Sequence, residues 1–238
     1  MIKIINKKLF LSFAVLSFIT GVIIVLSRYD RSFAGESYNN FLTLKFADGL
    51  SEQNTALFMT IMNIIAAVPF VSALVNNDSQ TINIYILPRV KSVTLWYFRK
   101  SMHCLAFCFI ENFSYNMGLL LTYLAFDHIA EEPFQLFRYL LITQFYGTLV
   151  LFVIVIFSQI LSQFMQRMLS IVFSEIIAFA FTCFAALVPQ KLKDVLFMTY
   201  YFQCENITLI SVFVLGSIIA AEIAIGLSVF KHSDHIGR

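Results

Sequence analysis

Six long apolar runs dominate this chain of 238 residues and restrict what it can fold into. They cover residues 9–26, 56–75, 103–126, 139–163, 168–188 and 207–230, and each is 18 to 25 residues long. A helix rises about 1.5 Å per residue, so each run can cross the roughly 30 Å hydrocarbon core of a bilayer. Lipid accepts only helices or closed barrels, and these runs lack the alternation of barrel strands. The sequence therefore predicts an all-α membrane protein with six transmembrane helices.

The composition agrees with a chain whose solvent is lipid. Hydrophobic residues make up 59% of the sequence and charged residues only 13%, whereas soluble domains carry about 25% charged residues. We therefore expect a single transmembrane domain over residues 1–238, with membrane lipid as a partner. The net charge of +2 gives no reason to expect a nucleic acid.

The first run needs a comparison with a secretory signal, because Lys3, Lys7 and Lys8 precede it and residues 32–34 loosely resemble a cleavage site. The run is 18 residues long, which is longer than the usual signal core, and two arginines separate it from that site. We therefore expect residues 9–26 to stay in the protein as a span.

The distribution of charge predicts the topology. If the N-terminus is cytoplasmic, the inner segments carry ten Lys and Arg residues and the outer segments six. Only two acidic residues fall inside and nine fall outside. Because basic residues are retained in the cytoplasm during insertion, we expect both termini in the cytoplasm. Residues 76–102, between the second and third runs, then form the largest cytoplasmic segment.

Motifs for chemistry are missing from the sequence. No glycine is followed by lysine, which excludes a phosphate-binding Walker loop on this chain. There is also no Gly-x-Ser-x-Gly or His-Glu-x-x-His motif, and His103 with Cys104 and Cys108 is too small a set for a metal site. The pair Glu131-Glu132 resembles an intramembrane protease motif, but the position of the required arginine holds Leu136. We expect no enzyme activity, no metal and no cofactor on this chain.

The segment 76–102 mixes apolar and basic residues in the pattern of an amphipathic helix at the membrane surface. Its second half carries the sequence Ile86-Leu87-Pro88-Arg89, and Trp96 and Lys100 follow. With six spans and cytoplasmic termini, this arrangement resembles the membrane subunit of type-2 ABC exporters, of the class that serves bacteriocin and lantibiotic export or immunity. The resemblance is one of topology over nearly the whole chain, and the local motif is short.

This resemblance implies that residues 80–98 form a coupling helix, which docks into a separate cytoplasmic ATPase subunit that binds ATP and Mg. The residues implied in ATPase coupling are Pro88, Arg89, Val90, Val93, Trp96, Tyr97 and Lys100. Buried aromatic anchors dominate the energetics of such interfaces. The alternative is an interfacial helix whose basic side chains contact lipid phosphates.

Three carboxylates lie within the predicted spans, namely Glu111, Glu175 and Glu222. Each lies seven or eight residues from the cytoplasmic end of its run, which corresponds to a depth of about 10–12 Å. Ionisable residues at membrane depth are costly, so they indicate a functional site. This intramembrane polar layer would contact a cationic substrate or relay protons. Alternatively, the glutamic acids are protonated and hold helices together.

We expect this chain to be the permease subunit of an ATP-driven exporter in a bacterial cytoplasmic membrane. The expected substrate is hydrophobic or amphipathic, such as an antimicrobial peptide, and a second permease, identical or paralogous, would complete the pathway. The alternatives are a proton-coupled secondary transporter that uses the three glutamates, or a non-transporting immunity or sensor subunit.

Overall fold

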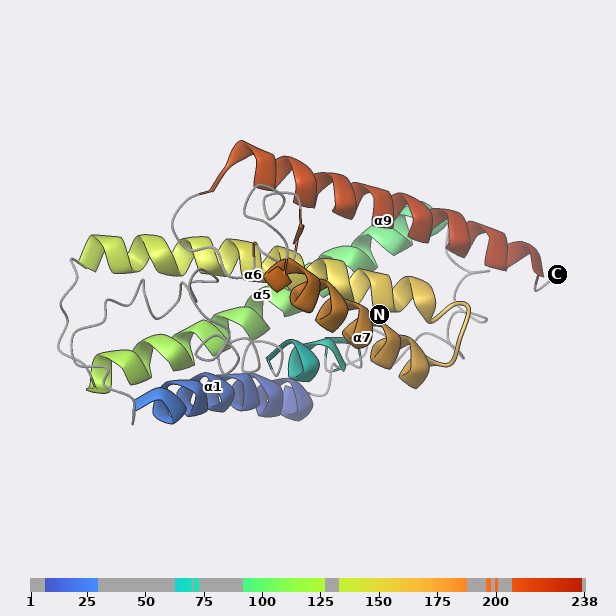
Figure 1. The fold of residues 1–238 in the computed structure, drawn as a ribbon. Coiled ribbons are helices and arrows are strands. Elements are labelled where there is room, and N and C mark those ends of the chain that lie inside the picture. The colour runs from blue at the N-terminus through green and yellow to red at the C-terminus, as the bar shows by residue number, and fades with distance from the viewer. Residues whose placement is uncertain are drawn as a thin grey trace.

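The computed structural model describes residues 7–29, 63–69, 71–72, 92–126, 133–187, 196–197, 200 and 207–236. All regular structure in this part of the chain is helical, which confirms the predicted all-α class. The labelled helices are α1 (Lys7–Tyr29), α5 (Val93–Phe126), α6 (Pro133–Leu161), α7 (Arg167–Leu187) and α9 (Leu209–Ile236) (Figure 1). Residues 63–69 and 71–72 are also helical.

Local sequence signals explain where these helices begin. Ser92 caps α5, because its hydroxyl accepts a hydrogen bond from the Leu95 amide at 3.3 Å. Thr208 caps α9 in the same way, through the Ser211 amide at 3.2 Å. Pro133 occupies the first position of α6, where its missing N–H costs nothing.

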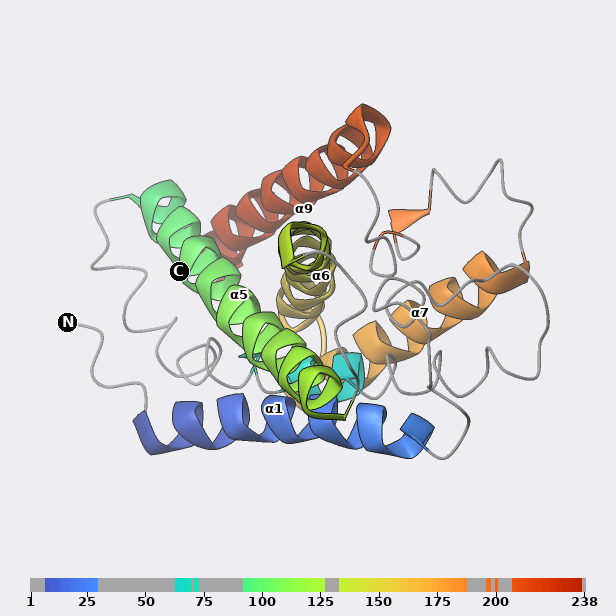
Figure 2. The ribbon, with the colours of Figure 1, turned by 90° about the vertical axis from the view of Figure 1, so that its left-hand side faces the viewer.

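Helix α6 is the centre of the bundle. In its apolar segment, 67% of the residues are buried within the chain, against 17% for the segment of α9. Viewed along its axis, α6 lies among α5, α9 and α7 (Figure 2). Every residue from Val150 to Ile156 is buried. Other helices surround this part of α6, which explains why it is apolar on all sides.

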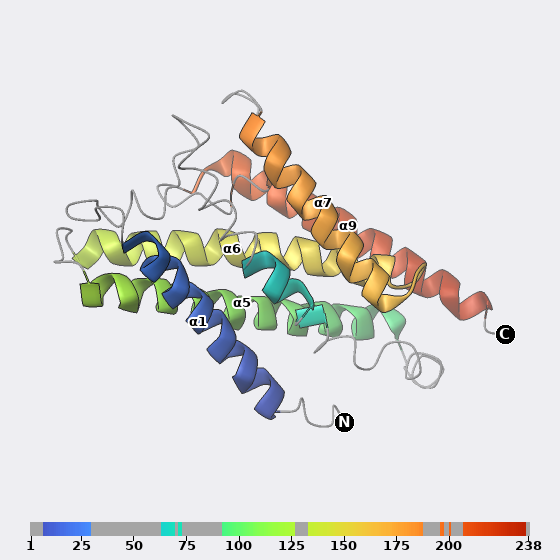
Figure 3. The ribbon, with the colours of Figure 1, turned by 60° about the horizontal axis from the view of Figure 1, so that its bottom comes forward.

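Helix α1 packs against α5, and α7 packs against α6, each at an oblique crossing (Figure 3). The turn at residues 162–166 joins α6 to α7 and begins with tight hydrogen bonds from Gln163 to Ile160 and from Phe164 to Leu161. The bundle therefore buries its apolar surface mainly around α6 and leaves much of α9 and α7 uncovered by this chain.

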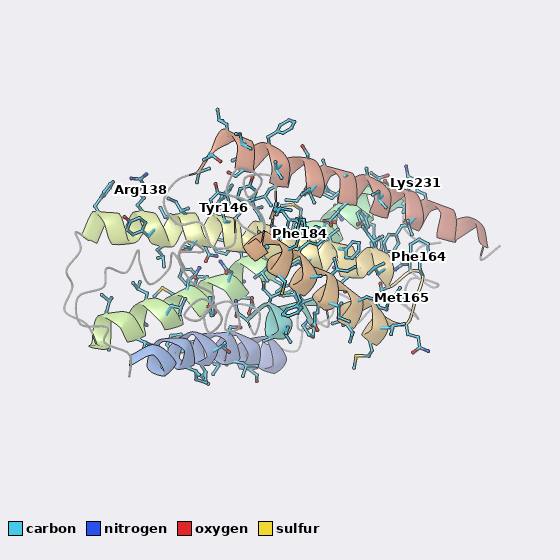
Figure 4. The ribbon with its side chains drawn as sticks, in the orientation of Figure 1. Arg138, Tyr146, Phe164, Met165, Phe184 and Lys231 are labelled. Carbon is cyan, nitrogen blue, oxygen red and sulfur yellow. The ribbon has the colours of Figure 1, made fainter. Side chains whose placement is uncertain are left out.

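Helices α1, α5 and α7 run in one direction along the bundle, and α6 and α9 run in the opposite direction (Figure 1). The starts of α1, α5 and α7, the turn after α6 and the end of α9 all lie at one end (Figure 1). We call this the basic end, because it carries Arg99, Lys100, Arg167 and Lys231. Lys231 and Phe164 mark it in the view with side chains, while Arg138 lies at the opposite end (Figure 4).

Three helical segments in the described part are long and apolar enough to cross a membrane: Val93–Thr122, Phe137–Leu161 and Leu209–Lys231. Helices α1 and α7 contain shorter apolar stretches, at Ala14–Ile23 and Met168–Phe181. The second predicted span, 56–75, falls partly outside the described residues. Six spans and the cytoplasmic location of both termini stay predictions.

One boundary differs from the expectation. The third span was predicted to begin at residue 103, after a separate cytoplasmic segment, but α5 begins at Val93 and runs unbroken to Phe126. Residues 93–102 contain neither proline nor glycine, so nothing in the sequence ends the helix before the apolar run. The second half of the predicted coupling segment is therefore continuous with the span.

Candidate functional site

The predicted coupling residues are divided between two parts of the chain. Pro88, Arg89 and Val90 lie outside the described residues. Val93, Trp96, Tyr97 and Lys100 occupy the first turns of α5, at the basic end of the bundle.

Trp96, Tyr97 and Lys100 gather around Phe230 near the end of α9. The Phe230 ring centroid lies 5.7 Å from that of Trp96 and 5.1 Å from that of Tyr97. The Lys100 ammonium lies 5.3 Å from the Trp96 ring centroid and 5.8 Å from that of Phe230. These distances are typical of aromatic pairs and of cation–π contacts. The four residues therefore connect α5 to α9.

Tyr97 is fully buried in this contact, whereas Trp96 is partly exposed. A Cβ atom added at Gly226 would overlap the Tyr97 hydroxyl, so only glycine at this position admits the ring. As the structure stands, Tyr97 faces α9 and does not reach the surface that a partner protein would contact.

A different set of side chains forms the outer face of the first turns of α5. Leu95, Phe98 and Met102 are each about half exposed, and Arg99 is exposed beside them. We call these four residues the docking face. Positions i, i+3 and i+7 share one side of a helix, so the spacing of the three apolar residues could have indicated this face in the sequence.

Glu111 lies deep in the contact between α5 and α1 and is only 2% exposed. The Ser17 hydroxyl donates a hydrogen bond of 2.6 Å to its Oε1 atom. Its Oε2 atom is buried and has no hydrogen-bond partner among the described residues. The carboxyl group is therefore half satisfied inside the protein, which is costly in an apolar medium.

Two glycines bring α1 close enough for that hydrogen bond. A Cβ atom at Gly21 would lie 2.5 Å from the carbonyl oxygen of Tyr115, and one at Gly118 would overlap the Phe18 carbonyl. Small residues permit such close crossings of membrane helices. The carboxylate at Glu111 thus depends on a backbone contact one to two turns away.

On its other side, α5 joins α6 through a buried network of amides. The Asn112 and Asn116 side chains donate to Oε1 of Gln144 at 3.1 and 3.0 Å. The Gln144 amide nitrogen donates to the Phe109 carbonyl at 2.8 Å and to Thr148 at 3.2 Å. Gln144 therefore uses both ends of its side chain, and this network reads as structural support for α5.

Glu175 and Glu222 are partly exposed, and each has one buried oxygen without a hydrogen-bond partner in the described part of the chain. Glu222 lies one turn before Gly226 on the same face of α9, the face that meets Tyr97. No hydrogen bond between described residues joins Glu111, Glu175 and Glu222. The shared layer of three carboxylates stays a prediction.

Three buried polar side chains of α5, α6 and α7 have different surroundings. The Ser174 hydroxyl donates to the Ile171 carbonyl in its own helix at 2.8 Å. Gln159 is 1% exposed, and neither end of its amide finds a partner among the described residues. Asn112, next to Glu111, belongs to the network with Gln144.

No family model, curated protein or solved structure matches this chain. The candidate site therefore rests on the side chains of this chain alone.

Two arrangements have functional potential. One is the basic end, where the docking face lies on a helix that continues into the interior. The other is Glu111, a buried acid that retains an unused acceptor atom. The described residues contain no group of three or more His, Cys, Asp or Glu side chains that could hold a metal ion.

Proposed function

We propose that this chain is the permease subunit of an ATP-driven exporter in a bacterial cytoplasmic membrane, with ATP and Mg bound by a separate ATPase subunit. A second permease, identical or paralogous, completes the pathway. The substrate is hydrophobic or amphipathic, and a peptide is the favoured class. The proposal rests on the topological resemblance to type-2 ABC exporters and on one feature of the fold.

That feature is the unbroken course of α5. The helix carries the docking face near its start, and Glu111 lies about five turns from its first residue, Val93. A chain without a nucleotide site can respond to ATP only through contact with a partner. A continuous helix transmits such a contact as a rigid-body shift, because packed helices move without deforming internally.

The docking face has the composition of an interface with a partner protein. Phe98 supplies an aromatic side chain, Leu95 and Met102 supply apolar area, and Arg99 supplies a forked cation that can pair with carboxylates. Trp96 and Lys100 lie beside this face, but they also contact Phe230. This supports an ATPase interface formed by the docking face together with the predicted residues Pro88, Arg89 and Val90.

The test is purification of the tagged chain from its native membrane, followed by measurement of vanadate-sensitive Mg-ATPase activity in the preparation. The wild-type chain is expected to bring such activity with it. The double variant Phe98→Ala with Arg99→Ala is expected to lose at least tenfold, while yield is unchanged. Phe134→Ala is the matched control, because Phe134 is an exposed phenylalanine at the opposite end of the bundle. Equal activity in both variants would contradict the proposal.

A proton-coupled secondary transporter is the second candidate, and the half-satisfied Glu111 carboxyl favours it. Liposomes that contain this chain alone distinguish the two. Transport of a hydrophobic cationic dye driven by a pH gradient, and abolished by Glu111→Gln, would replace the exporter with this candidate. The exporter predicts no such transport without its ATPase.

A further inference from the structure

The cluster between α5 and α9 at the basic end does more than bury aromatic area. Trp96 and Tyr97 both contact Phe230, and Lys100 lies over the rings of Trp96 and Phe230. Elsewhere the apolar segment of α9 is mostly uncovered by this chain. Helix α9 also packs along α6, and the contacts with the start of α5 give it a second neighbour at this end of the bundle.

The fit of Tyr97 makes this contact sterically specific. Its ring is fully buried, and its hydroxyl meets the backbone of α9 at Gly226, where no larger residue fits. Glu222, Gly226 and Phe230 follow each other at intervals of four, so they share the face of α9 that meets α5. A ring inserted against a glycine resists sliding of one helix along the other.

From this geometry we infer that the start of α5 and the end of α9 form one rigid unit, which we call the inner clamp, consisting of Trp96, Tyr97, Lys100, Gly226 and Phe230. A displacement of the docking face is carried by the clamp to α9, and with it to Glu222. The transmission of this displacement to α9 rests on the proposed function, whereas the rigidity of the clamp does not.

The clamp identifies α9 as the helix that responds to the cytoplasmic partner. Glu222 lies one turn from Gly226 on the face of α9 that meets Tyr97, so movement of the clamp changes the surroundings of this acid within the span. Glu111, in contrast, is held by α1 through Ser17. Both acids nevertheless lie on helices of the clamp, because α5 runs unbroken from the clamp to Glu111.

The experiment measures the distance between spin labels on the full chain in lipid nanodiscs. The labels replace two exposed side chains outside the docking face, through Ala106→Cys on α5 and Lys231→Cys on α9. Cys183→Ser and Cys204→Ser remove other sites of labelling, while Cys104 and Cys108 are fully buried. A rigid clamp gives one narrow distance distribution.

Matched glycine variants show whether the clamp is the cause. Gly226→Val forces a side chain into Tyr97 and is expected to broaden the distribution at least twofold. Gly216→Val makes the same change on the same helix, where nothing lies within 4 Å of the added atom, and is expected to leave it narrow. Phe230→Ala removes the ring without adding bulk, and it serves if Gly226→Val does not fold. A broad wild-type distribution, or no change in Phe230→Ala, overturns the clamp.

The same labels test whether the displacement reaches α9 when the chain is bound to its ATPase. With MgATP and vanadate, the Ala106–Lys231 distance is expected to stay constant, while a second pair at Lys231 and Arg138 changes its distance. A change in the first pair overturns transmission to α9. If no ATPase is recovered, the proposed function fails, and the measurement on the chain alone still decides whether the clamp exists.

Discussion

At the scale of single residues, the surroundings of Glu111 show how this chain tolerates an acid in its interior. The carboxyl group receives one hydrogen bond from Ser17, and that bond crosses from α1 to α5. Interhelical hydrogen bonds in membrane proteins contribute about 0.6 kcal/mol on average, and leaving a buried polar group without its partner costs about 1–3 kcal/mol. Loss of the Ser17 hydroxyl therefore costs more free energy than an average interhelical hydrogen bond, because Glu111 stays buried without a partner.

We predict that Ser17→Ala lowers the free energy of unfolding by about 1–2 kcal/mol, because it leaves both Glu111 oxygens without a partner. Titration with a denaturing detergent, followed by circular dichroism, measures the change. Ser114→Ala is the control, since the Ser114 hydroxyl donates only to the Ile110 carbonyl of its own helix. If the two variants lose the same stability, the hydrogen bond to Glu111 has no special importance.

At the scale of helices, close contacts at glycine decide which helices meet. Gly21 and Gly118 allow α1 to touch the backbone of α5, and Gly226 admits Tyr97 between α5 and α9. Gly216 has open space instead, so its substitution serves as a control for both contacts.

Gly118→Val is expected to lower the free energy of unfolding by about 1–3 kcal/mol, the usual cost of adding bulk to a packed contact. The added side chain would push α1 away from α5 and would also break the bond from Ser17 to Glu111. Detergent titration measures the loss of stability. Faster labelling of Ser17→Cys by a small maleimide shows that α1 has moved away from α5. If Gly118→Val and Gly216→Val show the same stability and the same labelling rate, the contact between α1 and α5 is not tightly packed.

The helices themselves followed from the sequence, but their contacts did not. Lengths of apolar runs predicted α1, α6, α7 and α9 to within a few residues, apart from longer ends at Pro133 and Ile236. A coupling helix over residues 80–98 and a span from residue 103 were predicted as separate elements, whereas α5 is capped by Ser92 and runs unbroken to Phe126. Burial of Tyr97 could not be predicted, because it depends on a glycine more than a hundred residues away.

The three glutamates illustrate the same limit at the candidate site. Their shared distance from the ends of the runs suggested one layer. The described structure gives two of the acids different neighbours: Ser17 donates to Glu111, and Glu222 lies on the face of α9 that meets Tyr97. Depth along a helix can be estimated from sequence, but the face on which a side chain lies against another helix requires the packed bundle.

At the scale of the whole molecule, one end of the bundle gathers the starts of α1, α5 and α7 with the end of α9 (Figure 1). The charge count predicts that this end is cytoplasmic. We therefore expect Lys231→Cys to react with a membrane-impermeant maleimide only after the membrane is opened, and Arg138→Cys to react in intact cells. The reverse pattern would invert the topology and exclude the docking face from contact with an ATPase.

Photo-cross-linking from the docking face tests most directly whether this surface contacts an ATPase. A photoreactive phenylalanine analogue replaces Phe98 in one variant and Phe134 in the other, and the cells are illuminated before extraction. We predict that position 98 forms a cross-link to a protein that azido-ATP also labels, and that position 134 does not. Cross-links from position 98 to lipid alone, or identical products at both positions, would contradict it.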